Sequence, residues 1–306
     1  ALRQPGSSFK MYTYALAMEN GYTPQTVVTD GPISWGNWSP QNYGRSYAGR
    51  ITMETALAKS INTIPVRLAK EKLGIDAIMA TAKAMGVETP LRKDVTIPLG
   101  TSEVTVMDQA TAYAVLPAGG YQSRRHGVAQ IMNYNGDVLY DFERDTPAPE
   151  RILTEQAAGY MNQMMTKIPY IGTARRAAVD GILTGGKTGT TQAYRDAWFV
   201  GYTGNYTAAV WFGNDDYTST NNMTGGSLPA MTFKKLMDYA HHGIDLKPIM
   251  GVDAPMPEKD AKPKVASATD ADANALPPMV RPRSLSGQST RLIRELGQRL
   301  RSAPAL

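Results

Sequence analysis

Three strand-like segments follow one another closely in the second half of the chain, at residues 184–191, 197–203 and 206–212. They are rich in Thr, Val and aromatic residues, and Gly204 and Asn205 supply a tight turn between the last two. This spacing is typical of an antiparallel meander. Most of the chain before residue 184 carries helical patterns instead. The sequence therefore predicts an α+β fold, with helices gathered around a mainly antiparallel sheet.

Apolar residues recur at helical spacing in several segments, most of which have a start or stop signal. The predicted helices cover residues 9–19, 52–59, 63–73, 75–85, 105–116, 154–165 and 229–241, with a short one opening at Thr173. Asn62 or Thr63 is expected to cap the third, and Thr105 with Asp108 to form a capping pair. Residues 131–140 read as a hairpin, because Asn-Gly separates two apolar arms. Residues 22–50 are expected to form a long ordered loop.

A serine and a lysine stand three positions apart near the start of the chain, at Ser7 and Lys10. Pro5 and Gly6 break the chain just before them, so Ser7 is predicted to lie at a helix N-terminus. Residues three apart share a helix face, which lets the Lys10 amine reach the Ser7 hydroxyl. A lysine desolvated beside another cation can act as the base for such a nucleophile. This pair is common by chance, so its chemistry depends on partners elsewhere.

The motif Lys-Thr-Gly-Thr at residues 187–190 opens the first strand of the meander. A glycine within a strand marks a place where another group approaches the backbone closely. An extended peptide can lie along such an edge, with Lys187, Thr188 and Thr190 holding its carboxylate. A surface strand with a bulge is the alternative interpretation of this motif.

Ser60 and Asn62 form a third motif, in the loop between two predicted helices. The order Ser-x-x-Lys, Ser-x-Asn, Lys-Thr-Gly is the signature of penicillin-binding proteins and class A β-lactamases. A second Ser-x-Asn, at residues 219–221, follows the Lys-Thr-Gly and is in the wrong order.

In these motifs the chain resembles the transpeptidase domain of class A, bifunctional penicillin-binding proteins. The resemblance extends to residues 56–63, 99–105, 186–191 and 196–202, and it covers roughly residues 1–245. It implies the penicillin-binding/β-lactamase-like fold of serine transpeptidases, whose strands before the serine helix are not in this sequence. One departure is Met11, where relatives often carry proline.

The resemblance also implies roles for the motif residues. Ser7 is the acylated nucleophile and Lys10 its proton acceptor, while Ser60 and Asn62 relay the proton and hold the substrate amide. Lys187, Thr188, Gly189 and Thr190 are the substrate-binding residues, which take the terminal carboxylate. The backbone amides of Ser7 and Thr190 form the oxyanion hole.

The implied reaction is peptidoglycan cross-linking. Ser7 displaces the last D-alanine of a D-alanyl-D-alanine stem peptide, and a neighbouring strand's amine takes the acyl group. β-Lactams act as covalent inhibitors of such enzymes. Because the chain starts with Ala1 close to the serine motif, we expect it to be part of a longer protein. That protein is expected to have a membrane anchor upstream, a glycan-polymerising domain, and a place at the periplasmic face of the inner membrane.

Two other enzymes share the serine and lysine motifs: a serine β-lactamase and a D,D-carboxypeptidase. Class A β-lactamases hydrolyse the acyl-enzyme with a glutamate whose motif places an asparagine four residues later. No glutamate of this sequence has an asparagine at that spacing. The sequence therefore favours the transpeptidase over the lactamase, and leaves a carboxypeptidase side activity open.

Composition narrows the chemistry further. The chain has no cysteine, and His126, His241 and His242 are too few and scattered for a metal site or a Ser-His-Asp triad. No cofactor and no metal are therefore predicted. Nucleic acid is not indicated either, since the body carries no basic stripe interleaved with aromatics.

The chain is expected to divide near residue 248, between a transpeptidase domain (1–248) and a Pro- and Ala-rich tail (249–306). Large apolar residues are scarce in the tail, so it is predicted to be disordered. Near its end, residues 290–301 are expected to form a short amphipathic helix. From Gly251 onward the sequence has nine Lys and Arg against six Asp and Glu, so much of the net charge of +5 lies there.

Overall fold

A three-stranded antiparallel sheet lies in the second half of the folded chain, in a computed structural model that describes residues 1–252. Its strands are β5 (Gly185–Thr190), β6 (Asp196–Tyr202) and β7 (Thr207–Gly213), in that spatial order. The predicted meander is thus confirmed. β6 is buried along its whole length because it has a neighbour on each side. β5 lies at one edge of this sheet and carries the Lys-Thr-Gly motif there.

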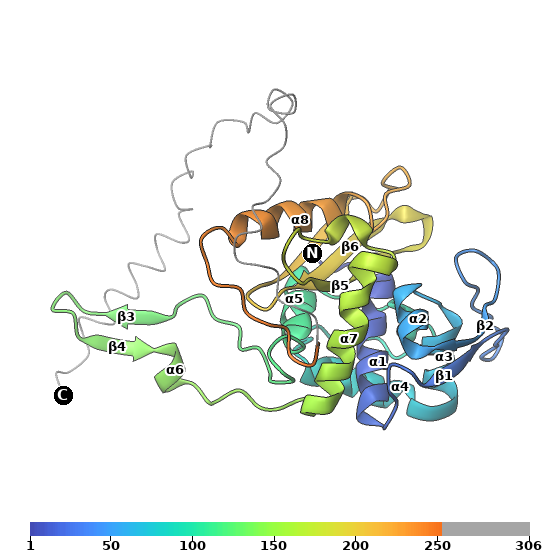
Figure 1. Ribbon diagram of the computed structural model, residues 1–306, viewed down its shortest axis with the longest axis horizontal. Helices are drawn as coiled ribbons and strands as arrows, with labels where there is room; N and C mark the ends of the chain where they lie inside the picture. Colours follow the sequence, from blue (N-terminus) through green and yellow to red (C-terminus); the bar gives the residue numbers. More distant parts are fainter. Residues whose placement is uncertain (253–306) are drawn as a thin grey trace. The chain divides into compact units, whose positions relative to one another are not determined.

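Helices account for most of the remaining regular secondary structure, which confirms the predicted α+β class. They are α1 (Lys10–Glu19), α2 (Met53–Ala58), α3 (Thr63–Leu68), α4 (Ile75–Ala84), α5 (Val106–Ala114), α6 (Phe142–Asp145), α7 (Glu155–Ile171) and α8 (Leu228–Ala240). Figure 1 shows α8 lying over the sheet, while α1 and α7 run close together. None of the helices within residues 1–252 has the length and apolarity needed to cross a bilayer.

Side-chain caps start α5 and α7, whereas the cap predicted for α3 does not form. The Thr105 side chain accepts a hydrogen bond from the Asp108 backbone, and the Asp108 side chain accepts one from the Thr105 backbone, a complete capping box for α5. The Thr154 hydroxyl accepts from Ala157 and starts α7, which continues to Ile171 rather than stopping at residue 165. The prediction that Asn62 or Thr63 caps α3 is wrong. Asn62 stands at the N-cap without a side-chain capping bond, because its amide bonds to Lys10 and Gln41, and the Thr63 hydroxyl bonds to Asp30.

The segment 22–50 is more ordered than a loop. It contains β1 (Val27–Asp30), which pairs with β2 (Gly49–Thr52) in an antiparallel ladder that sets Asp30 opposite Gly49. Each strand has four residues, too few for a period of two to stand out in the sequence. The prediction of a long loop is therefore wrong at both ends of the segment.

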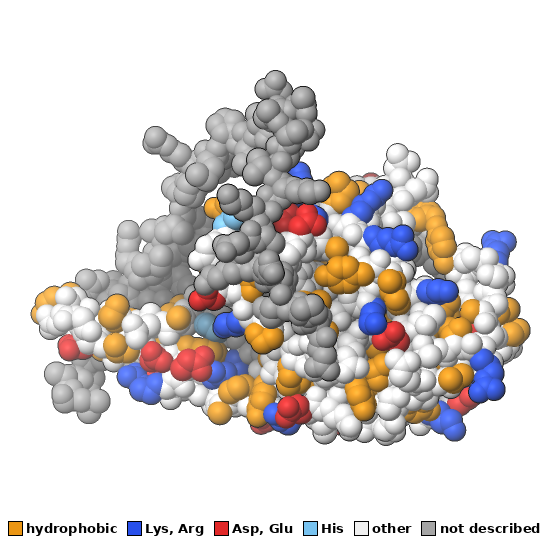
Figure 2. Space-filling view, in the orientation of Figure 1, with side chains coloured by type: hydrophobic (Ala, Val, Ile, Leu, Met, Phe, Trp, Pro, Cys, Tyr) orange, Lys and Arg blue, Asp and Glu red, His pale blue; other side chains and the backbone are white. Residues whose placement is uncertain are grey.

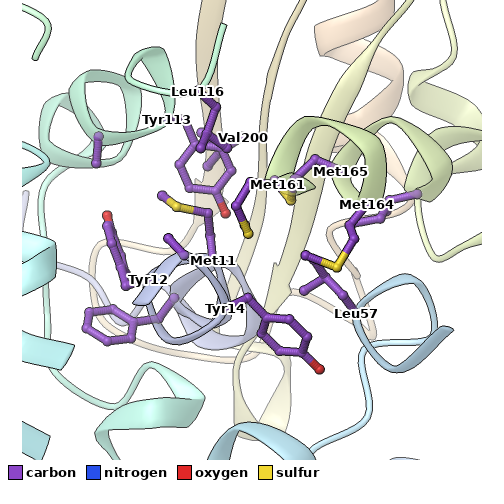
Figure 3. Packing of buried hydrophobic residues seen from close by; sticks show 14 of the residues in the cluster. Met11, Tyr12, Tyr14, Leu57, Tyr113, Leu116, Met161, Met164, Met165 and Val200 are labelled. Atoms are coloured by element: carbon purple, nitrogen blue, oxygen red, sulfur yellow. The ribbon is translucent and has the colours of Figure 1, made fainter. Parts of the chain in front are cut away.

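Helix α1 runs through the middle of the core. Figure 3 shows Met11 of this helix close to Tyr113 of α5, with Tyr12 and Tyr14 on opposite sides of α1 and a group of α7 methionines on the side of Tyr14. The α7 methionines are Met161, Met164 and Met165, all fully buried. Flexible methionine side chains fill irregular gaps between packed helices. Because α1 is covered on nearly every side, the lysine at its first position is buried too.

A hairpin stands away from the rest of the fold, as Figure 1 shows. Its strands are β3 (Gln130–Met132) and β4 (Val138–Asp141), which confirms the predicted hairpin. Hydrophobic side chains lie along it in Figure 2, and Tyr134 at its tip is 97% exposed. Two strands without a covering layer are marginal alone, so the hairpin depends on its attachment to the body.

The folded part continues to the last described residues. Ile249 is 2% exposed, and the Met250 carbonyl accepts a hydrogen bond from Asn162 on α7. Residues 253–306, with the amphipathic helix predicted near 290–301, lie outside the described residues.

Glycines let the turn before α1 lie directly against β5. A Cβ at Gly189 would stand 2.2 Å from the carbonyl oxygen of Pro5, far inside van der Waals contact. On the other side of this contact, Gly6 has φ +54°, and a Cβ there would meet the Thr190 carbonyl oxygen at 2.8 Å. The predicted close approach at Gly189 is therefore a contact between two backbones of the same chain.

Gly189→Ala should lower the free energy of unfolding by about 3 kcal/mol, since neither backbone can move away without breaking the sheet or the turn. Chemical denaturation of the purified protein measures this value. Gly127→Ala is the matched control, because nothing lies within 4 Å of its Cβ position. Equal stability of the two variants would show that the turn and β5 are not in tight contact.

Candidate active site

The two neighbouring serines before α1 have different surroundings. They lie in a 3-10 turn, Gly6–Phe9, which leads directly into the helix, so Ser7 is near the predicted N-terminus. Ser8 is fully buried; its hydroxyl donates to the Pro5 carbonyl at 2.8 Å and accepts from Gln109 at 2.6 Å. Ser7 is half-buried, and no hydrogen bond within residues 1–252 engages its hydroxyl. Of the two, Ser7 has the hydroxyl that is free to react.

Lys10, the first residue of α1, directs its amine at the Ser-x-Asn turn. Its Nζ lies 2.8 Å from the Ser60 carbonyl oxygen, 2.6 Å from Asn62 Oδ1 and 3.2 Å from Ser60 Oγ. Lys10 as a whole is only 1% exposed. Burial first, and the nearby charge of Lys187 second, hold the pKa of Lys10 well below its ordinary value of 10.5.

Lys187 reaches the same turn from strand β5. Its Nζ donates to Ser60 Oγ at 2.9 Å and to the Thr188 carbonyl oxygen at 3.1 Å. Burial lowers the pKa of Lys187 to about 7. One serine hydroxyl therefore lies between two lysine nitrogens that come from distant parts of the chain. Ser60 itself has φ +56°, a left-handed conformation that costs a residue with a side chain about 1–3 kcal/mol.

The state in which both lysines are charged is disfavoured, because the two amines are buried and lie on the same hydroxyl, so their positive charges repel each other. The form with one proton fewer is favoured, and Lys10 is the member whose pKa is lowered by the other's charge. A neutral Lys10 has a lone pair that can accept the Ser7 proton. Lys187 then keeps its charge, and an arriving carboxylate would raise its pKa further.

Threonine hydroxyls extend the site along β5. Thr188 Oγ1 lies 2.6 Å from Thr173 Oγ1 and 3.4 Å from Lys187 Nζ. Thr190 Oγ1 accepts from the backbone of Gly225 at 3.0 Å. Hydroxyl donors beside a lysine can bind a carboxylate.

The structure thus brings the three motifs together: Lys10 and Lys187 meet at Ser60, and Asn62 bonds Lys10. Gly189 lies against the Pro5 carbonyl, directly before the Gly6–Phe9 turn that carries the two serines (the serine turn). Thr188 and Thr190 stand on either side of this contact on β5. The second Ser-x-Asn does not join them. It lies between β7 and α8, where Thr220 donates to the Tyr194 carbonyl.

Several contributors have no local signal in the sequence. Gln109 and Tyr113 of α5 hold Ser8, and Thr173 and Gly225 contact the two β5 threonines. Gln109 could have been noticed as a polar residue on the apolar face of a predicted helix. Across the described residues, His, Asp and Glu side chains form no group of three that could hold a metal.

A family model described as penicillin binding protein transpeptidase domain matches residues 2–238. The chain belongs to this family. Its sequence is 34% identical over 237 residues to penicillin-binding protein 1A of Aquifex aeolicus. This match covers 76% of the chain and 32% of that relative. It is 33% identical over 271 residues to penicillin-binding protein 1A of Neisseria meningitidis, with coverage of 84% and 33%. The chain spans about a third of the length of these relatives.

Solved structures agree with the family. PonA1 of Mycobacterium tuberculosis superposes with a TM-score of 0.75 at 28% identity, over 86% of this chain and 78% of that one. A second PonA1 structure, in complex with penicillin V, gives a TM-score of 0.73 at 27% identity, over 81% and 72% of the two chains. The fold is therefore that of penicillin-binding transpeptidase domains, as the sequence motifs predict.

Lys187→Met should change how stability depends on pH. Between about 7 and the unfolded value of 10.5, unfolded Lys187 still binds a proton that folded Lys187 has released, so wild-type stability should rise with pH. The methionine variant lacks this contribution. Its stability relative to wild type should therefore be highest near pH 6 and decline as the pH is raised to 10. Denaturant unfolding at a series of pH values measures the difference, and parallel curves would contradict a buried lysine with a lowered pKa.

Proposed function

We propose that the domain is the D,D-transpeptidase of a bifunctional cell-wall synthase, which cross-links peptidoglycan stem peptides through an acyl-enzyme on Ser7. The observation that carries this proposal is the Ser60 hydroxyl between Lys10 and Lys187, with Lys10 three positions along the chain from an unengaged Ser7. Among the described residues the Lys10 amine bonds to Ser60, Ile61 and Asn62 rather than to the Ser7 hydroxyl, so it would have to turn toward Ser7 to take its proton. That arrangement supplies a nucleophile, a neutral amine and a cation within one site. Membership of the transpeptidase family supports the same reaction.

In the proposed acylation, Ser7 Oγ attacks the carbonyl carbon between the two D-alanines. Lys10 Nζ accepts the Ser7 proton as the new C–O bond forms. When the C–N bond breaks, the proton passes by way of Ser60 Oγ to the leaving nitrogen, and D-alanine departs. The backbone amides of Ser7 and Thr190 would stabilise the oxyanion between these steps. The contact of Gly6 with the Thr190 backbone supports this pairing.

The donor carboxylate would lie along β5. Lys187 supplies the charge, and the Thr188 and Thr190 hydroxyls donate to the carboxylate oxygens. Gly189, by lying against the serine turn, keeps this anion site at a fixed distance from Ser7. Asn62 would bind the donor amide through its side chain.

An amine of a neighbouring stem peptide would then attack the ester carbonyl, with Lys10 taking the amine proton. As the C–O bond to Ser7 breaks, Lys10 would pass that proton to Ser7 Oγ and so restore the hydroxyl. A β-lactam offers a strained amide and a carboxylate in the same relative positions, so it would acylate Ser7 by the same contacts. The PonA1 relative solved with penicillin V supports this expectation.

A serine β-lactamase is the second candidate, because it shares the three motifs. It also requires a group that activates water on the open face of the ester, and no glutamate here has the asparagine spacing of that motif. Hydrolysis of the acyl-enzyme, whether by a lactamase or as a carboxypeptidase side activity, is accordingly proposed to be slow.

The chain's relatives are about three times its length, so the proposal extends to a longer protein. We place that protein at the periplasmic face of the inner membrane, with an anchor and a glycosyltransferase domain upstream. Its partners would be peptidoglycan strands that carry D-alanyl-D-alanine donors and amine acceptors, with no cofactor in either half-reaction.

Incubation of the full-length protein with a penicillin should yield a penicilloyl adduct that persists for many minutes, because no glutamate of the sequence has the asparagine spacing of the lactamase motif. Intact-mass spectrometry with peptide mapping locates the adduct. Ser7→Ala should abolish it, whereas Ser8→Ala should retain it, since the Ser8 hydroxyl is committed to Pro5 and Gln109. Rapid turnover without an adduct, or an adduct on Ser8 or Ser60, would refute the proposed site.

Lys10→Ala should slow acylation by penicillin about 10²- to 10⁴-fold, the usual contribution of a general base. Stopped-flow measurement with a fluorescent penicillin gives the rate constant. Lys93→Ala provides the control. Lys93 is an exposed lysine paired with Asp76, so this variant should react with penicillin at the wild-type rate. An unchanged rate in Lys10→Ala would assign the proton transfer to another group.

A further inference from the structure

Asp30, at the end of β1, is a buried carboxylate that no motif includes. It is 1% exposed, and within residues 1–252 no lysine, arginine or histidine pairs with it. Its oxygens accept hydrogen bonds from Asn42 Nδ2 at 2.9 and 3.0 Å, from the Ala48 backbone at 2.7 Å and from the Thr63 hydroxyl at 2.6 Å. All of these groups are donors, so they fit an ionised carboxylate, which only accepts. A buried charge without a counter-ion is costly and needs a full set of such donors.

Asn42 connects this carboxylate to the Ser-x-Asn turn. Because its NH₂ group faces Asp30 and the Ser46 carbonyl, its Oδ1 faces the other way and accepts from the Asn62 backbone at 2.9 Å. The carboxylate of Asp30 thus fixes which way the Asn42 amide points. An amide or apolar side chain at position 30 would not.

The residue before Asn42 fixes the side chain of Asn62. The Gln41 carbonyl accepts from Asn62 Nδ2 at 2.7 Å, which turns Asn62 Oδ1 toward Lys10 Nζ, 2.6 Å away. Residues 41 and 42 therefore hold Asn62 at two points, its backbone N–H and its amide. The next residue of the turn, Thr63, donates its hydroxyl directly to Asp30.

We propose that Asp30 and Asn42 are positioning residues for the proposed transpeptidase reaction. Asp30 acts through Asn42 and Thr63 to hold the 60–63 turn, and the turn holds Lys10 through the Ser60 carbonyl and Asn62 Oδ1. Neither Asp30 nor Asn42 touches the reacting atoms. Because the inference rests on the proposed function, it concerns the rate and the pH dependence of acylation at Ser7.

The physical basis is the cost of misplacing a base. A proton acceptor displaced by about 1 Å can lose about 100-fold in rate. A turn released from Asp30 would also admit water to Lys10, and hydration would raise the pKa of its amine toward the ordinary value. The acid limb of the pH–rate profile reports the deprotonation of the base, so it should move to higher pH.

The test uses full-length Thr63→Val and Asp30→Asn, with Thr63→Ser and Thr166→Val as controls. Thr63→Val removes one hydroxyl from Asp30, and Thr63→Ser restores it. Thr166→Val removes a buried hydroxyl that bonds only to carbonyls of its own helix, at Asn162 and Gln163. Titration with a fluorescent penicillin first gives the fraction of molecules competent to form the adduct. The acylation rate constant of that fraction at saturating penicillin is then measured across pH.

Thr63→Val and Asp30→Asn should lower the normalised rate constant about 10- to 100-fold and shift the acid limb to higher pH. Thr63→Ser and Thr166→Val should keep both at wild-type values. A merely structural role would lower the competent fraction or the melting temperature and leave the normalised rate and the limb unchanged, which would overturn the proposal. Should Asp30→Asn fail to fold, the milder Thr63→Val decides. A wild-type protein that forms no adduct at Ser7 would instead refute the proposed function itself.

Discussion

The site depends on burying two lysines around one serine hydroxyl. Both amines lie out of water, both point at Ser60, and burial lowers the pKa of each. Such an arrangement works against the stability of the fold, and backbone carbonyls at Ser60, Ile61 and Thr188 compensate for part of it. The same desolvation that costs stability lowers the pKa of both amines, so that a neutral amine forms at a lower pH than it would for a lysine in water. The burial that lowers the pKa of these lysines is therefore the same burial that lowers the stability of the fold, as is common at functional sites.

Rigid elements hold this arrangement in place. Lys10 opens a helix that is covered by α5 and α7, and Lys187 lies on a strand whose neighbour β6 is buried throughout. Backbone contact at Gly189 and Gly6 joins the two elements without any intervening side chain. A site built on a central helix and a paired strand keeps its geometry better than one built on loops. The 60–63 turn is the least regular part, and it is the part that Asp30 and Asn42 support.

The sequence predicted what local chemistry encodes. Helix caps such as Thr105, the Asn-Gly hairpin and the meander all depend on neighbouring residues, and the structure has them. Motif order also predicted that Lys10, Ser60 and Lys187 would share a site. What it did not predict lies in contacts between distant residues: Gln109 under Ser8, Thr173 beside Thr188, and the links from Asp30 to the turn. Asn42 sits in a stretch rich in Gly, Pro and Asn, where nothing in the pattern separates a structural asparagine from a surface one. β1 and β2 were missed because four residues are too short for periodicity.

The contact between the serine turn and β5 also determines when the site can exist. Trp198 of β6 donates to the Gln4 carbonyl across 194 positions of sequence, and Lys187 reaches Ser60 across 127. On a ribosome, the segment with Ser7 and Lys10 emerges long before the strand that completes its surroundings. During that interval Lys10 is solvated and protonated, so the serine beside it has no base. The proposed acylation of Ser7 would therefore become possible only late in synthesis, in the same step as the docking of the sheet.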